Sequence, residues 1–253
     1  AGARRAGPPR GRRRAWGRPA AGGGAGGGAP PRRYGVLWRR GGAGWHGVNA
    51  AALRLLGGDE NGYWMLRPTG RFASERRYRP STLILETVFK TDGGRVRIID
   101  FMPLRTELSK VVRIVEGLEG EVEMRSELVV RFDYGVSVPW VSRIEGDAIS
   151  LVAGASMLLL RTDVPMHGEA MKTVGSFPVA RGQRMAFVLS HQISYQQPAA
   201  AEDPAALLEQ TERFWCEWSG RCEAAGALSE RGGGSLATRK GLAGWRRGGR
   251  RPP

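Results

Sequence analysis

The pattern of apolar and polar residues in the middle of the chain is that of β-strands. Residues 121–132 alternate strictly, and one face of this segment carries Val122, Met124, Ser126, Leu128, Val130 and Phe132. Because successive side chains of a strand point to opposite faces, the segment predicts a strand with one buried and one solvated face. Residues 82–90 carry apolar side chains on both faces, which predicts a strand covered from both sides.

Interruptions of this pattern predict turns. Short Gly-containing runs lie at residues 92–94, 118–120, 145–147 and 153–155, between the strand-like segments. Glycine and aspartate tolerate the positive φ of hairpin turns. In residues 95–102 the alternation slips at Ile98 and Ile99, which predicts a β-bulge.

The spacing of these segments predicts the fold class. About ten short strands at roughly regular intervals are typical of a mainly β protein, here a large antiparallel β-sandwich. Pro165 and Pro178 are expected at strand ends or edges, because proline cannot donate a ladder hydrogen bond.

One helix is predicted after the strands. Asp203 suits the N-cap and Pro204 the first helical position. An apolar stripe follows at helical spacing, formed by Leu207, Thr211, Phe214, Trp218 and Cys222 and widened by Leu208 and Trp215. So broad a stripe needs a partner surface, supplied by the sandwich alone or together with a following domain. The residues expected to make this packing are Leu207, Phe214, Trp215 and Trp218.

Charge is concentrated at the two ends of the chain, which has 253 residues and a net charge of +15. Residues 1–50 hold 11 Arg and no Lys, Asp or Glu, and residues 223–253 hold 7 basic and 2 acidic residues. Residues 51–222 hold 21 basic and 22 acidic residues, so this part needs no polyanionic partner. The predicted divisions are a Gly/Arg/Ala/Pro segment (1–50), a β-sandwich (51–200), a linker helix (201–222) and a basic tail (223–253).

The two ends allow three interpretations. Residues 20–29 are glycine and alanine and bury too little surface to offset backbone ordering, so disordered ends are the simplest expectation. An RGG-like tail that binds nucleic acid is an alternative, weakened because Arg and Gly do not repeat regularly with interleaved Phe or Tyr. The abrupt changes of composition favour the third interpretation, GC-rich DNA translated out of frame.

Few residues offer chemistry of their own. The three histidines, at 46, 167 and 191, have no metal-ligand spacing, and no G-x-S-x-G elbow or phosphate loop is present. The sequence therefore predicts no metal and no cofactor. Glu86, Asp100 and Asp133 are the carboxylates tested for acid–base chemistry. We expect them to be solvated or paired with an arginine, such as Arg131 or Arg77 for the two aspartates.

Cysteine spacing and hydropathy indicate the compartment. Cys216 and Cys222 are six residues apart on the predicted helix and cannot pair without unwinding it. This favours a reducing, cytoplasmic setting. No stretch resembles the apolar core of a signal peptide or a membrane span of about 18 apolar residues, so no membrane partner is predicted.

Six fragments occur in an order that resembles one known domain. They are residues 59–64 (DENGYW), 77–87 (RYRPSTLILET), 99–103 (IDFMP), 113–117 (RIVEG), 131–135 (RFDYG) and 139–140 (PW). Together they resemble the trehalase-like N-terminal domain of bacterial family 15 glycoside hydrolases, the glucoamylase and trehalase-like group, over about residues 55–222. The resemblance implies a large antiparallel β-sandwich joined by a helical linker to an (α/α)₆ barrel, whose two Glu residues hydrolyse α-glucosidic bonds with inversion.

The resemblance departs from the family pattern at both ends. Just after Cys222, before the barrel, the chain leaves the pattern, so no catalytic Glu is assigned and the chain is expected to be inactive alone. An α-glucan or trehalose would be its substrate only within a full-length enzyme. Before Leu55 the Gly/Arg segment replaces an expected strand. A sheet edge left unpaired in this way predicts aggregation or partial order of the isolated chain.

Asp133, Tyr134 and Trp140 are the remaining functional candidates, expected on a loop at one end of the sandwich. Aromatic rings pair with the C–H faces of sugars, and a carboxylate accepts hydroxyl hydrogen bonds. The three residues are predicted to lie at the substrate rim or at the contact with the barrel, while packing of Trp140 in the core is an open alternative. A stand-alone carbohydrate-binding module is the second hypothesis, and nucleic-acid binding through the Arg/Gly-rich ends is the third.

Overall fold

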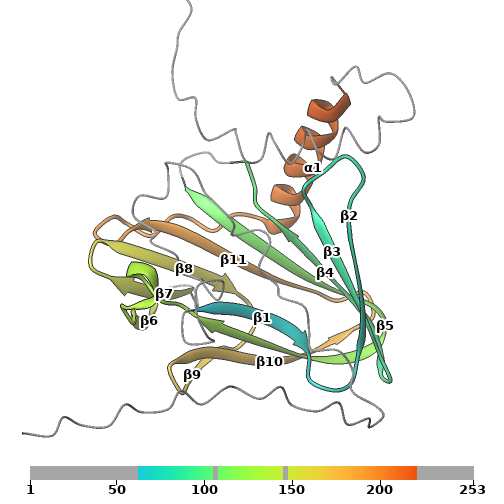
Figure 1. Ribbon diagram of the computed structural model, residues 1–253, viewed down its shortest axis with the longest axis horizontal. Coiled ribbons are helices and arrows are strands. Elements are labelled where there is room, and N and C mark those ends of the chain that lie inside the picture. Colours follow the sequence, from blue (N-terminus) through green and yellow to red (C-terminus); the bar gives the residue numbers. More distant parts are fainter. Residues whose placement is uncertain (1–61, 105–107, 145–147, 221–253) are drawn as a thin grey trace, which may run out of the picture. The chain divides into compact units, whose positions relative to one another are not determined.

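The computed structural model describes residues 62–104, 108–144 and 148–220. Within these residues it contains eleven strands, whose pairings are all antiparallel, and one α-helix, α1 (Pro204–Gly220) (Figure 1). The expected mainly β fold with one helix near the C-terminus is therefore confirmed. The predicted low-complexity segment and basic tail lie outside the described residues.

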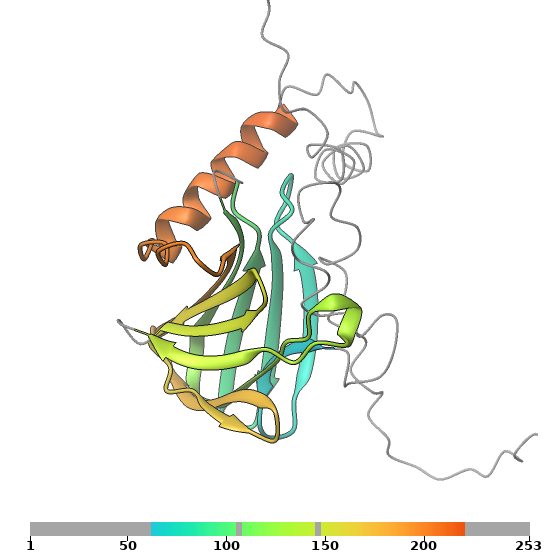
Figure 2. The ribbon, with the colours of Figure 1, turned by 90° about the vertical axis from the view of Figure 1, so that its left-hand side faces the viewer.

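The strands form two layers that share one long strand. The small sheet contains, in order, β1 (Tyr63–Pro68), the second half of β5 (Ser109–Val129), β10 (Lys172–Ala180) and β9 (His167–Glu169). The large sheet contains, in order, β2 (Ala73–Tyr78), β3 (Leu85–Thr91), β4 (Gly94–Phe101), the first half of β5, β11 (Arg184–Ile193), β8 (Ser156–Thr162), β7 (Ala148–Ala153) and β6 (Trp140–Ile144). Figure 2 shows the same strands from the side.

Strand β5 passes from one sheet to the other. Its residues up to Gly120 pair with β4 and β11, and from Glu121 onward it pairs with β1 and β10. The predicted turn at residues 118–120 is therefore wrong, because the chain continues as a single strand of 21 residues. Gly120 has a φ of +60°, and this left-handed residue redirects the strand instead of reversing it.

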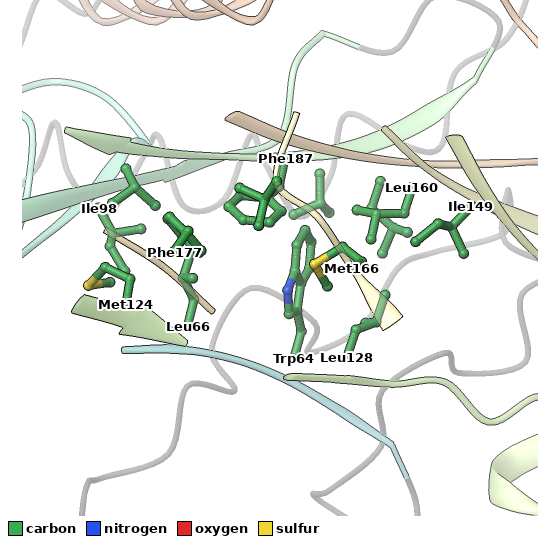
Figure 3. Packing of buried hydrophobic residues seen from close by; sticks show 14 of the residues in the cluster. Trp64, Leu66, Ile98, Met124, Leu128, Ile149, Leu160, Met166, Phe177 and Phe187 are labelled. Carbon is green, nitrogen blue, oxygen red and sulfur yellow. The ribbon is translucent and has the colours of Figure 1, made fainter. Parts of the chain in front are cut away.

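The core lies between the two sheets. Leu66, Met124 and Leu128 reach it from the small sheet, while Ile98, Leu160 and Phe187 reach it from the large one (Figure 3). The alternation predicted for residues 121–132 is confirmed, since each of the six residues of the apolar face is at most 3% exposed. Trp64 meets Phe187 edge to face, with their ring centroids 6.2 Å apart.

The large sheet has a second apolar cluster on its outer face. It consists of Ile84, Ile99, Phe101, Val112 and Ile114, and Leu207 and Leu208 of α1 pack against it. Figures 1 and 2 show α1 beside the ends of β3 and β4. Because both faces are covered here, residues 82–90 are apolar on both sides as predicted, although β3 begins only at Leu85.

The β-bulge predicted at Ile98 and Ile99 is wrong, because both faces of the strand are buried there. Ile98 lies in the inner core and Ile99 in the outer cluster, so two consecutive isoleucines follow ordinary strand alternation. The register between β4 and β5 shifts instead between Arg95 and Val96. When both faces of a strand are buried, two consecutive apolar residues look like a break in the alternation although the strand is regular.

The remaining local predictions concern turns and caps. Residues 92–94 and 153–155 do connect neighbouring strands, while residues 145–147 lie outside the described part. Pro165 lies between β8 and β9, and Pro178 lies in the stretch of β10 that has no pairing with β9. Asp203 caps α1, since its carboxylate accepts hydrogen bonds from the backbone N–H groups of Ala205 and Ala206.

Candidate functional site

Glu86 is the most enclosed carboxylate of the outer sheet face. Its side chain is 4% exposed and accepts hydrogen bonds from three arginines. Arg79 Nε lies 2.9 Å from Oε1, Arg97 Nη1 3.3 Å from the same oxygen, and Arg77 Nη2 3.2 Å from Oε2. Because both carboxylate oxygens are occupied, Glu86 is bound as a structural anion.

These pairs continue across the sheet as a series that we call the ion ladder. Arg97 also binds Glu116, with its Nε 3.0 Å from Oε2, and Arg184 Nη2 lies 2.7 Å from Glu116 Oε1. Neighbouring strands place these residues opposite one another, since Arg97 and Arg184 are both register partners of Glu116. The ladder contains Arg77, Arg79, Glu86, Arg97, Glu116 and Arg184, and Glu212 of α1 joins it through Arg79.

Electrostatics hold the two ladder glutamates in the ionised form. Burial alone would raise the pKa of Glu86, but hydrogen bonds from Arg79 and Arg77 and the charges of Arg97 and Arg79 outweigh it. The pKa of Glu86 is therefore lower than its ordinary value of 4.5. Burial likewise opposes ionisation of Glu116, but Arg97 and Arg184 lower its pKa. A general acid for glycoside hydrolysis needs a raised pKa, so neither glutamate suits that role.

We expect Glu86→Gln to change the pH dependence of stability. A depressed folded-state pKa adds stability that is present above the unfolded pKa and is lost as pH falls through the folded value. The difference in unfolding free energy between parent and variant should therefore be largest at neutral pH and shrink below pH 4.5. Urea titrations between pH 3 and pH 7, on the order of five points, would measure it.

Glu75→Gln is the matched control for this experiment, because Glu75 lies on the exposed strand β2. Its effect on the free energy of unfolding should stay within about 0.5 kcal/mol throughout. An equal difference between parent and Glu86→Gln at every pH would contradict the account.

Asp100 and Arg113 form a buried ion pair between the sheets. Arg113 Nε lies 2.8 Å from Asp100 Oδ1, and Nη2 lies 3.4 Å from Oδ2. Arg113 also donates from Nη1 to the carbonyl oxygen of Trp64, 3.2 Å away, and its guanidinium carbon lies 5.0 Å from the centroid of the Trp64 ring. The pair thus links β4 and β5 to β1 across the core.

This pairing corrects the expected partners of the aspartates. Arg113 holds Asp100, Arg77 binds Glu86, and Arg131 donates to the carbonyl of Val130. The sequence did contain a signal for the true pair. Asp100 lies directly between Ile99 and Phe101, and Arg113 between Val112 and Ile114, so each is a charge flanked by apolar residues. Antiparallel pairing of the two strands places them opposite each other.

Two of the predicted loop candidates, Asp133 and Tyr134, lie between β5 and β6, whereas Trp140 is the first residue of strand β6 and not part of a loop as expected. Asp133 begins a short 3₁₀ helix, Asp133–Gly135, with a φ of +50°, and its carboxylate accepts a hydrogen bond from Ser137 Oγ at 2.5 Å. Backbone hydrogen bonds between Phe132 and Ser137 close the loop. Of Tyr134 the structure describes only the backbone. Asp133 therefore binds within its own loop and is exposed to solvent, which matches the expected solvated carboxylate and not the alternative of an arginine partner.

Trp140 lies on the surface of β6, with 80% of the residue exposed. Val136 and Val138, in the loop before it, and Val141, after it, are also exposed. Packing of Trp140 in the core is therefore excluded for the described part of the chain. The arrangement presents an indole ring and three valines at the edge of the large sheet, where a ring face is available to a ligand.

The four helix residues predicted to make packing contacts are all buried or half-buried. Leu207 packs on the outer cluster, and Trp215 is buried at 8% exposure. Phe214 and Trp218 are half-buried, and each contacts Trp215 edge to face, with ring centroids 5.3 and 6.0 Å apart. The first half of the helix therefore packs on the sandwich, while in its second half the three aromatic residues of the helix contact one another.

Comparisons with known proteins do not assign the chain to a family. No family model and no curated protein matches the chain. Among solved structures, one described as a kojibiose phosphorylase from the human microbiome is similar with a TM-score of 0.33 and 10% identity. The match covers 70% of this chain and 27% of that one, so this chain spans about a quarter of that protein's length.

No group of three or more His, Cys, Asp or Glu side chains in the described part of the chain is arranged to hold a metal ion. None of the helices in the described ranges has the length and apolar character needed to cross a membrane.

Proposed function

We propose that the chain is the non-catalytic N-terminal β-sandwich of a family 15 glycoside hydrolase. The parent enzyme would act on α-glucosidic bonds of glucans or of trehalose, in the cytoplasm. The sandwich would pack against the (α/α)₆ catalytic barrel that follows it and shape the rim of the active site. The substrate would meet the sandwich only within that larger enzyme.

The observation that carries this proposal is how the charged residues of the family-like fragments are used. Arg77, Arg79 and Glu86 all belong to residues 77–87, and both arginines donate hydrogen bonds to Glu86. Asp100 of residues 99–103 binds Arg113 of residues 113–117, which also donates to Trp64 of residues 59–64. The residues that carry the resemblance thus hold strands together. This supports a domain whose role is structural, with the catalytic acid and base elsewhere.

A hydrolysis assay tests the proposal. The purified chain should release no glucose from maltose or trehalose at any pH between 4 and 8, a range of about four units around the usual optimum of carboxylate chemistry. A commercial glucoamylase serves as the positive control for detection. Glucose release that exceeds the buffer blank, and that co-elutes with the chain on a sizing column, would refute the proposal.

The exposed ring of Trp140 favours one second candidate, a carbohydrate-binding module. In that case maltohexaose should bind saturably with the weak affinity typical of a single exposed platform, at roughly millimolar Kd. Trp140→Ala should abolish the binding, while Tyr195→Ala, which removes another ring with 79% exposure, should not. Titration calorimetry measures both. Absence of heat with the parent chain excludes this candidate and leaves the scaffold proposal in place.

A further inference from the structure

The segment between β11 and α1 is fastened to the large sheet by side chains from several strands. Gln192 of β11 accepts a hydrogen bond from the backbone N–H of Ala199 at 3.1 Å, and Arg161 of β8 donates to the carbonyl oxygen of the same residue at 2.5 Å. Side chains thereby satisfy both backbone polar groups of Ala199, its N–H and its carbonyl oxygen. Lys110 of β5 forms an ion pair with Glu202 at 2.5 Å, one residue before the N-cap.

The helix that follows is fastened by packing and by one arginine. Leu207 and Leu208 lie on the outer apolar cluster, and Thr211 and Trp215 are buried. Arg79, between β2 and β3, donates from Nε to Glu86 at 2.9 Å and from Nη1 to Glu212 of α1 at 2.5 Å. One guanidinium thus holds a carboxylate of the sheet and a carboxylate of the helix.

Arg79 is itself held in place by its turn. Its backbone N–H donates to the carbonyl of Ile84 at 2.9 Å, and its carbonyl accepts from the N–H of Thr82 at 3.1 Å. Its side chain is 18% exposed, and that of Glu86 is 4% exposed. The backbone of Arg79 is held by its turn, and its guanidinium is held by Glu86. Arg79 therefore loses little further conformational freedom when it also binds Glu212.

We infer that residues 194–220 are a strap fixed to the large sheet, with Arg79 as the fork that locks α1 against it. The anchors come from β11, β8, β5 and the turn before β3, so the segment is tied across most of the width of the sheet. The helix is therefore a part of the sandwich and not a flexible tether. The consequence for a catalytic domain that follows, a fixed orientation relative to the sandwich, rests on the proposed function.

Hydrogen exchange of the full chain, followed by mass spectrometry, tests the strap directly. Backbone amides of α1 should be protected in the parent chain, since an isolated helix of this length is marginal in water. Arg79→Met should accelerate their exchange by roughly three- to fivefold, because Glu212 is 41% exposed and an ion pair of this kind contributes about 1 kcal/mol or less. Peptides from β8 and β10 should exchange as in the parent.

Arg77→Met is the matched control. Arg77 binds Glu86 as Arg79 does, but its partner lies in β3 and not in α1, so its loss should leave helix exchange within about twofold of the parent. Glu212→Gln removes only the helix arm of the fork and should reproduce the Arg79→Met effect on α1 without disturbing Glu86. It also keeps the test decisive if Arg79→Met destabilises the whole sheet.

Three outcomes would overturn the inference. They are free-peptide exchange of α1 in the parent, unchanged exchange of α1 in both Arg79→Met and Glu212→Gln, and equal acceleration in Arg77→Met. The result is independent of the proposed function. Glucose release by the chain would refute the scaffold proposal and leave the strap intact, whereas an unprotected α1 would refute the strap and leave the scaffold proposal intact.

Discussion

Arg113→Met should lower the free energy of unfolding by about 3–5 kcal/mol, the cost of leaving one member of a buried ion pair without its partner. Arg113 and Asp100 are 5% and 6% exposed, and the aspartate accepts two hydrogen bonds from the guanidinium. Methionine fills much of the same volume, so the loss should reflect the stranded carboxylate and not a cavity. Denaturant titration with a fluorescence or circular-dichroism signal measures it.

Two further variants isolate the cause of this loss. Replacing both residues, as Asp100→Leu with Arg113→Met, should recover most of the stability, because no unpaired charge then remains in the core. Arg125→Met is the matched control, since Arg125 pairs with Glu127 on the outer face of the small sheet and should contribute about 1 kcal/mol or less. Equal losses in Arg113→Met and Arg125→Met would show that the buried pair has no special weight.

Gly120→Ala should cost about 3 kcal/mol or more, because it strains the point where β5 changes sheets. Gly120 has a φ of +60°, and a Cβ there would lie 2.1 Å from the carbonyl oxygen of Gly93. That oxygen is backbone, and it accepts the hydrogen bond of Glu121 N–H at 3.1 Å, so it cannot move without breaking the pairing. Thermal unfolding of parent and variant gives the difference.

Gly154→Ala is the control that separates backbone strain from collision. Gly154 has nearly the same φ, +58°, but a Cβ there would meet nothing within 4 Å. Its cost should be only that of the left-handed conformation, about 1–2 kcal/mol. If the two alanines lowered the melting temperature equally, the close approach of residues 93 and 120 would not be a determinant of the fold.

The sequence predicts the parts of this fold in which one face is wet. Residues 121–132 were assigned correctly because apolar and charged residues alternate there with two exceptions, Ser126 on the buried face and Val129 on the opposite face, and burial of the apolar face follows that alternation. The same reasoning misplaced the bulge in β4. Ile99 belongs to the outer cluster against which α1 packs, so apolar residues are buried on both faces of the strand and the alternation is hidden. It also assigned residues 118–120 to a turn, because a glycine in the left-handed region, here Gly120, occurs both where a chain reverses and where a strand bends.

The sequence does not predict the ion ladder or the strap, because both depend on contacts between residues that are far apart along the chain. Arg79 and Glu212 are 133 positions apart, and nothing in their local sequence indicates that they meet. Arginine and glutamate on exposed strand faces are common, so their pairing depends on which strands become neighbours. The order of β3, β4, β5 and β11 in the sheet decides it, and β11 is more than 50 residues away in sequence from the strand beside it, β5.

The central claim is that the enclosed carboxylates of this domain are structural anions. Carbon-13 NMR titration of the Glu86 and Glu116 side-chain carboxyls, assigned with the Glu86→Gln and Glu116→Gln variants, tests it most directly. Both should titrate below 4.5, held ionised by the arginines around them. A carboxyl among the two that titrates near neutral pH would be suited to donate a proton to a glycosidic oxygen, and would contradict a purely structural role.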